Sequence, residues 1–497
     1  MDRDFALRIA SVIIFVVMSL VGVGISYYLV VTSKTPLLFW LAISFLILSI
    51  VSGIFNVTSA YSYYRSYFYD RHLAEINKGL KPLKRLPSVA IAIPTYNEDP
   101  KLVEKTLLSM KKMDYDPKKM KIYLLDDSTK PEIKNELENF CKQEGVEYLH
   151  REERKGFKAG AINNFLKYSK EEFVAVFDAD ERLTNNKFLK DLLPYFQDEK
   201  LSFIQTEKRY DKGNFFSSCV DLFDAFFFKF IQPSRALNNT AIFAGSCGII
   251  RRSALDAIGG FPEYVIEDTF FSFESDMKGY RSLYIPKVYA LGAPITSFTA
   301  LSKQQWRYNY GDTQFMLHLL RNMKKHKKRT VSALSKIDYA LHGLGLNYLS
   351  IILIMFTVIS LVSVFASAPI TYETISQLVH FKLPSLNFEL FGLNAFLLSI
   401  LVPIAITKLY FNSISKGFMI FVLNFALAFV RLKAAIAAVF NLSPVTGWVK
   451  GITLRGRFLA ALKNSLLEVL FSIVLFIAGG PSFAVSSCKI FPSRTII

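Results

Sequence analysis

The chain has 497 residues, of which 52% are hydrophobic and 20% are charged, and its 59 Lys and Arg exceed its 41 Asp and Glu by a formal net charge of +18. Soluble domains carry roughly 25% charged residues, so this composition is shifted toward membrane proteins. The 45 Phe and 24 Tyr supply too much apolar surface for a disordered chain. The scattered cysteines, Cys141, Cys219, Cys247 and Cys488, exclude a disulfide scaffold and show no metal-ligand spacing.

Two apolar segments lie near the start of the chain, Ile9–Val31 and Leu37–Val57. Each has about the 20 apolar residues that a membrane-spanning helix needs, so we expect two transmembrane helices within residues 1–60. The first segment is too long for a signal peptide, and no clear small-residue cleavage site follows it. The excess of Lys and Arg over 65–85 marks the cytoplasmic side, which predicts a cytoplasmic domain over 61–330.

A second membrane region is predicted over 338–485. Three segments are apolar enough to span there: Leu346–Phe365, Phe391–Phe411 and Leu466–Ala478, the last continuing toward Phe483. With the first two segments they make five spans, and we expect a multi-pass protein of the plasma membrane with its large domain on the cytoplasmic side.

The stretch 413–440 is apolar but contains Arg431 and Lys433. If it crossed the membrane, the basic segment 450–463 would face outward, against the usual distribution of Lys and Arg. We therefore interpret 413–440 as a helix lying in the cytoplasmic interface. A sixth span is the alternative.

Residues 86–330 alternate short β-rich runs with helical stretches, a pattern typical of an α/β domain with a parallel sheet. Strands are predicted over 88–93, 121–125, 146–150 and 173–177, with a helix over Pro100–Lys112. Acidic or turn-forming residues follow three of these strands, in Pro94-Thr-Tyr-Asn-Glu98, Asp126-Asp127-Ser and Asp178-Ala-Asp180. Because ligands bind outside the carboxyl ends of strands in open α/β sheets, we expect these three segments to converge on one site.

Asp178 and Asp180 are two residues apart just past a buried strand, so both carboxylates can reach one hard cation. Mg²⁺ or Mn²⁺ held by one or two carboxylates completes its shell with phosphate oxygens. Such a cation would stabilise a departing nucleoside diphosphate. A solvated acidic turn is the alternative interpretation of this pair.

Seven motifs occur in a recognisable order along the chain. They are Pro94-Thr-Tyr-Asn-Glu98, Leu-Leu-Asp126-Asp127-Ser-Thr, Lys158-Ala-Gly-Ala161, Asp178-Ala-Asp180, Phe243-Ala-Gly-Ser246, Ile266-Glu-Asp268 and Gln304-Gln-Trp-Arg307-Tyr308. Their order resembles that of the membrane-integrated family-2 glycosyltransferases of the cellulose synthase superfamily, especially the mannan and glucomannan synthase-like branch and related bacterial glucan synthases. The resemblance covers about residues 85–330 and implies a GT-A, Rossmann-like transferase domain inserted between transmembrane helices.

The resemblance also implies a role for individual residues. A nucleotide-sugar donor would be bound by Pro94, Tyr96, Glu98, Asp126, Asp127, Lys158, Asp178 and Arg307. Asp268 would be the general base that deprotonates the acceptor hydroxyl, and Asp178 with Asp180 would hold the metal. The acceptor would be bound by Gly245, Ser246, Glu267, Gln304 and Tyr308.

The sequence departs from the family's pattern at two of these motifs. Ile266 replaces the usual Thr of Thr-Glu-Asp, which leaves both carboxylates in place. Tyr308 replaces the Trp of Gln-x-x-Arg-Trp, the usual marker of a processive polymerase, unless Trp306 substitutes for it through a register shift. Two hypotheses follow: extension and translocation of a polysaccharide such as a β-glucan or β-mannan, or transfer of a single sugar to a lipid phosphate or glycolipid.

Three further segments are assigned from position and resemblance. Interfacial helices are expected near 215–237, which is rich in aromatic residues, and near 303–325. The segment 441–452 loosely resembles the family's gating loop, which covers the occupied donor site.

The donor and the partners are predicted only by class. UDP-glucose or GDP-mannose is the expected donor, and UDP-N-acetylglucosamine is not discriminated from them. The expected partners are a polysaccharide or lipid acceptor and the bilayer. A transporter or a nucleic-acid-binding protein is disfavoured, because the basic cluster 321–329 adjoins a predicted membrane helix and lacks interleaved aromatic residues.

Overall fold

A computed structural model of the chain describes residues 2–33, 36–322, 339 and 404–442. The chain divides into two compact units, Met1–Val12 with Thr58–Gly345 and Ile13–Val57 with Leu346–Ile497. The predicted spans Leu346–Phe365 and Leu466–Ala478, and all but residues 404–411 of Phe391–Phe411, lie outside the described residues. The same holds for the gating loop beyond residue 442.

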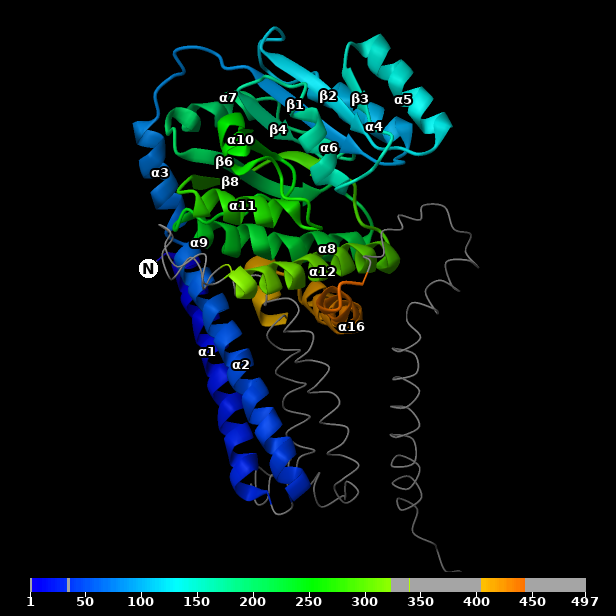
Figure 1. The fold of residues 1–497 in the computed structure, drawn as a ribbon. Coiled ribbons are helices and arrows are strands. Elements are labelled where there is room, and N and C mark those ends of the chain that lie inside the picture. Colours follow the sequence, from blue (N-terminus) through cyan, green and yellow to red (C-terminus); the bar gives the residue numbers. More distant parts are fainter. Residues whose placement is uncertain (1, 34–35, 323–338, 340–403, 443–497) are drawn as a thin grey trace, which may run out of the picture. The chain divides into compact units, whose positions relative to one another are not determined.

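The first unit is built on a single eight-stranded sheet in the order β3-β2-β1-β4-β7-β6-β8-β5 (Figure 1). The strands are β1 (Val89–Thr95), β2 (Met120–Asp126), β3 (Glu147–His150), β4 (Phe173–Val176), β5 (Arg182–Leu183), β6 (Leu201–Tyr210), β7 (Gly248–Arg251) and β8 (Arg281–Gly292). The strands predicted over 88–93, 121–125, 146–150 and 173–177 correspond to β1 to β4 with ends shifted by at most two residues.

The prediction of a parallel sheet is correct for only part of it. Strands β1 to β4 pair in parallel, as do β6 and β8, but β7 runs antiparallel to both β4 and β6, and β5 runs antiparallel to β8. The sheet is therefore mixed. The motif-bearing loop 243–247 leads directly into β7, so the antiparallel strand brings this loop to the edge where β1, β2 and β4 end.

Helices cover both faces of the sheet. The helices of the domain are α3 (Tyr69–Gly79), α4 (Pro100–Met110), α5 (Pro131–Glu144), α6 (Phe157–Phe165), α7 (Phe188–Leu192), the 3₁₀ helix η1 (Leu193–Gln197), α8 (Phe215–Phe226), the π-helical turn η2 (Phe227–Ile231), α9 (Gln232–Ala236), α10 (Arg252–Ile258), α11 (Glu267–Met277) and α12 (Phe298–Asn322).

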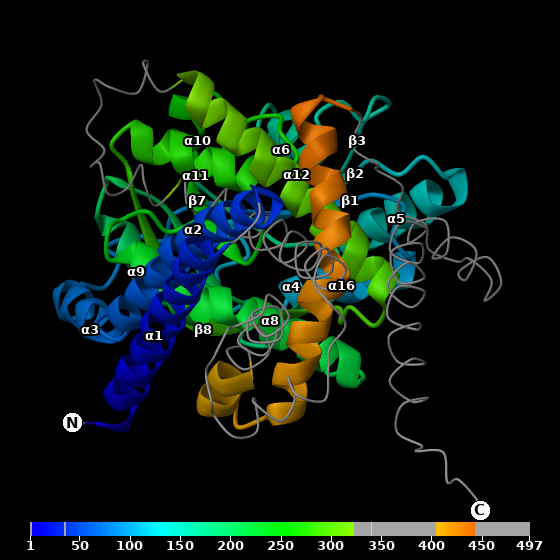
Figure 2. The same cartoon turned by 90° about the horizontal axis from the view of Figure 1, so that it is seen from below.

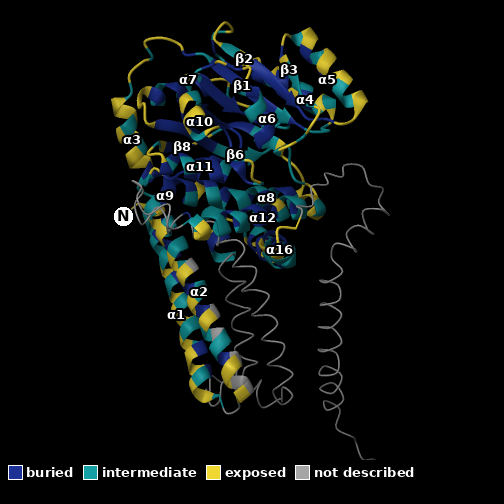
Figure 3. Cartoon of the chain, in the orientation of Figure 1, coloured by how far each residue is buried: buried dark blue, intermediate teal, exposed yellow. Residues whose placement is uncertain are grey.

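Alternation along β1 explains why the sheet has two cores. Val89, Ile91 and Ile93 point to one face and pack with α4, α5 and α7, whereas Ala90 and Ala92 point to the other and pack with α6, α10 and α11. The central strands β1, β4 and β7 are largely buried, and the outer surface of α5 is exposed (Figure 3). A strand with both faces covered is apolar throughout, which is why β1 is a continuous apolar run in the sequence.

Local signals in the sequence account for the helix ends near the site. Asp99 caps α4 by accepting a hydrogen bond from the Lys101 amide, and Pro100 follows at the first helical position. Gly145 ends α5 with a φ of +64°, in the left-handed region that glycine adopts without strain.

Three helices among the described residues are long and apolar enough to cross a membrane: α1 (Arg3–Thr32), α2 (Pro36–Ser66) over its residues Ala42–Ser66, and α16 (Ile414–Val439). Helices α1 and α2 lie side by side (Figure 1 and Figure 2). Between them, the hydroxyls of Ser26 and Ser49 are 2.7 Å apart, and Arg8 donates to the Ser66 hydroxyl at 2.7 Å.

Candidate active site

The carboxyl ends of β1, β2 and β4 meet at one edge of the sheet, as the sequence predicts. Thr95 of β1 is in register with Asp126 of β2, and Ala92 of β1 with Val176 of β4. The segments that begin with Tyr96, Asp127 and Asp178 therefore leave the sheet side by side. Pro94 lies inside β1 rather than after it.

Asn97 ties the first two of these loops together. Its φ of +50° lies in the left-handed region, which asparagine tolerates better than most residues. Its amide donates to the Ser128 hydroxyl at 2.9 Å, and its side-chain oxygen accepts from the Thr129 amide at 3.0 Å. The loop carrying Tyr96 and Glu98 is thus held against the loop that follows Asp127.

Asp126 and Asp127 are buried and already bonded to protein groups. Asp126 accepts from the Tyr148 hydroxyl at 2.7 Å and from the Ser128 amide at 2.9 Å. Asp127 forms a two-pronged ion pair with Arg151, with N–O distances of 2.8 and 2.5 Å. Asp126 is completely buried, and its two contacts hold the start of the loop that follows β2.

The Tyr96 ring is covered by the guanidinium of Arg154, whose central carbon lies 3.5 Å from the ring centroid. Burial lowers the pKa of Arg154, while the neighbouring Tyr96 and Asp127 raise it. A guanidinium over an aromatic face is a favourable arrangement that a planar heterocycle can also adopt. Arg154 therefore belongs to the same loop cluster as the predicted donor residues, although its sequence context was that of a basic turn.

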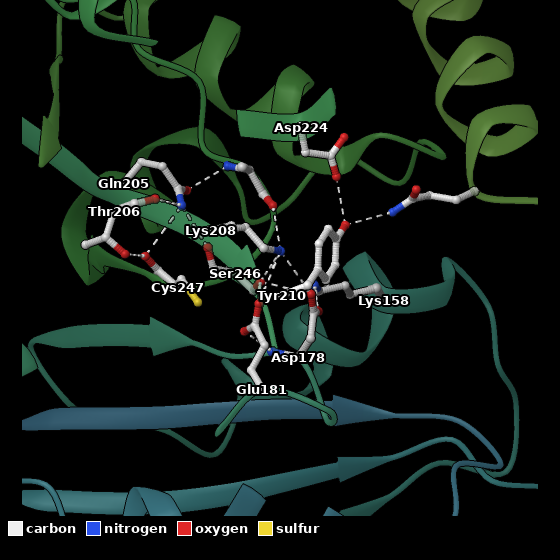
Figure 4. A network of polar contacts seen from close by, with 12 residues as sticks. Lys158, Asp178, Glu181, Gln205, Thr206, Lys208, Tyr210, Asp224, Ser246 and Cys247 are labelled. Carbon is white, nitrogen blue, oxygen red and sulfur yellow. Dashed lines mark hydrogen bonds and ion pairs between the residues drawn. The ribbon is translucent and has the colours of Figure 1, made fainter. Parts of the chain in front are cut away.

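Asp178 lies at the centre of a half-buried polar cluster (Figure 4). Lys158 of α6 donates to its Oδ1 at 2.5 Å, and Lys208 of β6 donates to its Oδ2 at 3.2 Å. Ser246 lies 2.9 Å from Asp178 Oδ2 and 2.7 Å from Glu181 Oε1. Glu181 also accepts from the Asp178 amide at 2.8 Å, which closes the turn of Asp178-Ala-Asp180.

Asp180 is surrounded by more negative than positive charge. Burial alone would raise the pKa of Asp178, but the ammonium groups of Lys158 and Lys208 hold it well below its ordinary value. Burial, together with the negative charges of Asp178 and Glu181, raises the pKa of Asp180 to about 7. An additional cation beside Asp180 would relieve this excess of negative charge.

The residues present fit a divalent cation that is shared with a phosphate ligand. Among the described residues, no group of three or more His, Cys, Asp and Glu side chains is arranged to hold a metal ion by itself. Mg²⁺ commonly takes only one or two protein carboxylates and fills its remaining positions with phosphate oxygens and water. The pair Asp178 and Asp180 meets that requirement.

The loop 243–247 is held in place by a buried glutamine of β6. Gln205 accepts from the Ala244 amide at 2.7 Å and donates to the Ser246 carbonyl at 2.9 Å. Gly245 has a φ of +81°, and a Cβ built on it would lie 3.0 Å from Asp268 Oδ2 and 3.6 Å from Lys158 Nζ. Gly245 therefore allows the loop backbone to pass between the proposed base and the lysine.

Glu267 and Asp268 form the first turn of α11, where Glu267 is buried and Asp268 is half-buried. Asp268 accepts from the Thr269 amide at 2.8 Å. Burial raises the pKa of Asp268, and burial together with the charge of Asp268 raises the pKa of Glu267 to about 7. The two adjacent carboxylates therefore interact electrostatically.

Helix α12 brings Gln304, Arg307 and Tyr308 to the same region. Gln304 donates weakly to the hydroxyls of Tyr308 at 3.3 Å and of Tyr210 at 3.4 Å. Burial would lower the pKa of Arg307, but nearby Tyr308, Glu267, Asp178 and Asp268 raise it. Trp306 is two residues from Tyr308, so helical geometry puts it on a different face of α12.

Several residues of the cluster were not predicted from sequence. They are Arg154, Glu181, Gln205, Lys208, Tyr210 and Asp224, which accepts from the Tyr210 hydroxyl at 2.8 Å. Burial raises the pKa of Asp224 to about 6. A signal was available for Lys208, because it lies in the charged run Glu207-Lys208-Arg209 near the end of β6.

Comparisons with known proteins agree with the fold and the motif order. Residues 90–259 match the family described as Glycosyl transferase family 2. A 236-residue stretch is 33% identical to a cellulose synthase catalytic subunit (UDP-forming) of Pseudomonas fluorescens and covers 46% of this chain and 31% of that protein. The corresponding protein of Xanthomonas axonopodis pv. citri is 31% identical over 236 residues, with coverage of 46% and 32%. The match thus spans about a third of these relatives' length.

A solved structure shares the fold. The mannosyltransferase of Pyrobaculum calidifontis, in complex with GDP-Man and Mn²⁺, superposes with a TM-score of 0.52 over 80% of this chain and 100% of its own. The two sequences are 17% identical, so the likeness establishes the fold alone, a GT-A-like α/β arrangement with a mixed sheet.

Proposed function

Because the chain carries a family-2 glycosyltransferase domain of the cellulose synthase superfamily, we propose that it transfers sugar from a nucleotide-sugar donor to a growing polysaccharide at a membrane. The observation that carries the proposal is the position of Gly245, beside both the carboxylate of Asp268 and the ammonium of Lys158. A proton acceptor and a cation suited to phosphate are thereby brought to one loop.

Asp268 is the proposed general base. Its carboxylate takes the proton from an acceptor hydroxyl as the hydroxyl oxygen attacks the anomeric carbon. The bond from that carbon to the diphosphate breaks, and the configuration at the carbon inverts. Glu267 lies next to the base and is proposed to contact the acceptor, as are Gly245, Ser246, Gln304 and Tyr308.

The leaving nucleoside diphosphate is negatively charged, and this chain offers it Lys158 and Arg307. Asp178 and Asp180 would hold Mg²⁺ or Mn²⁺, which when bound supplies further positive charge to the departing diphosphate. Pro94, Tyr96, Glu98, Asp126 and Asp127 would form the end of the site that takes the nucleoside.

The donor is proposed to be UDP-glucose or GDP-mannose. The bacterial relatives are named as UDP-forming cellulose synthases, and the structural neighbour is a mannosyltransferase with GDP-Man. The product of the first would be a β-glucan, and that of the second a β-mannan-like chain.

The membrane arrangement is part of the proposal. The exposed apolar side chains of α1 and α2, among them Leu20, Val31 and Trp40, each more than 60% exposed, support insertion of both helices in a bilayer. We place 61–330 on the cytoplasmic side and read 338–485 as the second membrane region, with five spans if 413–440 is interfacial and six if it crosses. The stretches 215–237 and 303–325 would lie at the membrane surface, and 441–452 would cover the donor site.

A donor screen tests the proposal. The purified full-length protein with Mg²⁺ or Mn²⁺ should release nucleoside diphosphate from one of UDP-glucose, GDP-mannose and UDP-N-acetylglucosamine. Asp268→Asn should lower that release at least about 100-fold and retain donor binding. Asp256→Asn, the same change at a surface ion pair of α10, is the matched control and should keep full activity. Undiminished release by Asp268→Asn would exclude it as the base.

Tyr308 favours a second candidate, transfer of a single sugar to a lipid phosphate or glycolipid. Its hydroxyl accepts from Gln304, so the ring is held by a polar contact that a Trp could not make in the same way. Sizing of the product separates the two candidates, since only single-sugar lipid products would rule out the polymerase.

A further inference from the structure

Lys208 contacts four residues of the Asp178 cluster. Its ammonium lies 3.2 Å from Asp178 Oδ2 and 3.3 Å from Glu181 Oε1, and it donates to the Ser246 hydroxyl. The Ala244 carbonyl is a further acceptor at 3.5 Å. Figure 4 shows the side chain reaching from β6 into the space between these groups.

These contacts neutralise the carboxylate that is proposed as a metal ligand. Asp178 has an ammonium on each oxygen, Lys158 on Oδ1 and Lys208 on Oδ2. A divalent cation that approaches Asp178 must therefore compete for the same oxygens and is repelled by two fixed positive charges at short range. Like charges a few ångströms apart repel one another, and here the two ammonium groups are partly shielded from water, because the side chains of Lys158 and Lys208 are only 26% and 25% exposed.

The two lysines are not equivalent in position. Lys158 lies on α6 and forms an ion pair with Asp178. Lys208 forms ion pairs with both Asp178 and Glu181. Its hydrogen bonds to Ser246 and Ala244 also hold the loop 243–247 in place. Lys208 therefore compensates the repulsion between Asp178 and Glu181 when no other cation is present.

We propose that Lys208 is an internal counter-cation of the metal site, which weakens binding of a free divalent cation and makes metal binding depend on the nucleoside diphosphate. The inference rests on the proposed metal-dependent transfer. The diphosphate brings negative charge and additional oxygen ligands, which offset the repulsion from Lys208 and Lys158. Metal and nucleotide should then strengthen each other's binding by the same factor.

Calorimetric titration of Mn²⁺ into the full-length, detergent-solubilised protein tests this directly. Lys208→Met should bind Mn²⁺ alone at least tenfold more tightly than the wild type. Lys212→Met removes the same charge from an exposed position four residues further along and should leave the affinity unchanged. Lys208→Arg keeps the charge and should also bind like the wild type.

The same titration with saturating UDP or GDP measures the coupling. The nucleotide should increase the affinity of the wild type for Mn²⁺ by a larger factor than that of Lys208→Met. A Lys208→Met protein that binds Mn²⁺ no more tightly than the wild type would overturn the inference. If Lys208→Met does not fold, Lys208→Gln replaces it under the same criterion.

The outcome also separates this inference from the proposed metal dependence. Asp180→Asn should lose Mn²⁺ binding in the wild-type and in the Lys208→Met background. If the wild type binds no Mn²⁺ even with UDP or GDP, the metal dependence fails and the inference fails with it. If the wild type binds Mn²⁺ and the Lys208 variants do not differ from it, only the role of Lys208 fails.

Discussion

Glu267 and Asp268 are adjacent carboxylates whose protonation we expect to govern activity. Burial raises the pKa of both, to about 7 for Glu267. A raised pKa keeps a carboxyl protonated at a pH where it would ordinarily be ionised, and a protonated carboxyl cannot accept the proton of an acceptor hydroxyl. Activity should therefore be full at high pH and be lost as the pH falls through the raised pKa.

The prediction is an acidic limb in the pH dependence of nucleoside diphosphate release, at a higher pH than an ordinary aspartate would give. Glu267→Gln removes one of two interacting negative charges, so Asp268 should ionise more readily and the limb should move to lower pH. The pH–rate profile of the variant measures this, with Glu263→Gln in the preceding loop as a control at the same charge. A limb that does not move would mean that another group causes it.

Helix α12 approaches the start of α11 closely at Gly311, which lies against Ile266. A Cβ built on Gly311 of α12 would lie 2.5 Å from Ile266 Cγ2 and 2.8 Å from its Cγ1. Ile266 is buried and immediately precedes Glu267 and Asp268, so this close approach sets the distance between the helix that carries the proposed base and the helix that carries Arg307.

Gly311→Ala should therefore separate the two helices. We expect a loss of about 1–3 kcal/mol in stability, as for other overpacked sites, and a lower rate of nucleoside diphosphate release. Gly79→Ala, at the end of α3 with open space around the site, is the matched control and should be neutral. The melting temperature and the rate of nucleoside diphosphate release, measured on both variants, check this. If Gly311→Ala changes neither quantity, the two helices can shift without consequence.

At the scale of the whole molecule, the net charge of +18 and the apolar helices have to be explained together. The basic segments 65–85, 321–336 and 450–463 are the ones that we assign to the cytoplasmic face. Lys and Arg concentrate on that side of membrane proteins and attract anionic lipid headgroups. The basic excess would then orient the protein, while the carboxylates at the strand ends perform the chemistry.

The topology can be tested with single cysteines. Cys141, Cys219 and Cys247 are buried and should react slowly, and Cys488→Ser removes the remaining thiol. In that background Thr32→Cys, at the exposed end of α1, should react with a membrane-impermeant maleimide in intact cells, whereas the exposed Tyr168→Cys should react only after the cells are opened. The reverse pattern would invert the proposed orientation.

The sequence by itself determined the elements whose signals are local. The strands β1, β2 and β4 are short apolar runs ended by polar residues, and α4 begins at Asp99-Pro100, so pattern alone located them within two residues. The order of seven motifs along the chain likewise carries the resemblance to family-2 glycosyltransferases. Both kinds of signal lie within contiguous stretches of the sequence.

Only the tertiary structure decided which residues meet. Lys208 reaches Asp178 across 30 positions of sequence and Ser246 across 38, and Gln304 reaches Tyr210 across 94. Such contacts depend on the antiparallel insertion of β7 and on the packing of α12, and no periodicity within a segment encodes them. The burial of Asp126 behind Tyr148 was hidden for the same reason. The position of an acidic residue at the end of a strand predicts that it lies near the site. Whether its side chain faces a ligand or another part of the protein depends on how distant elements pack together.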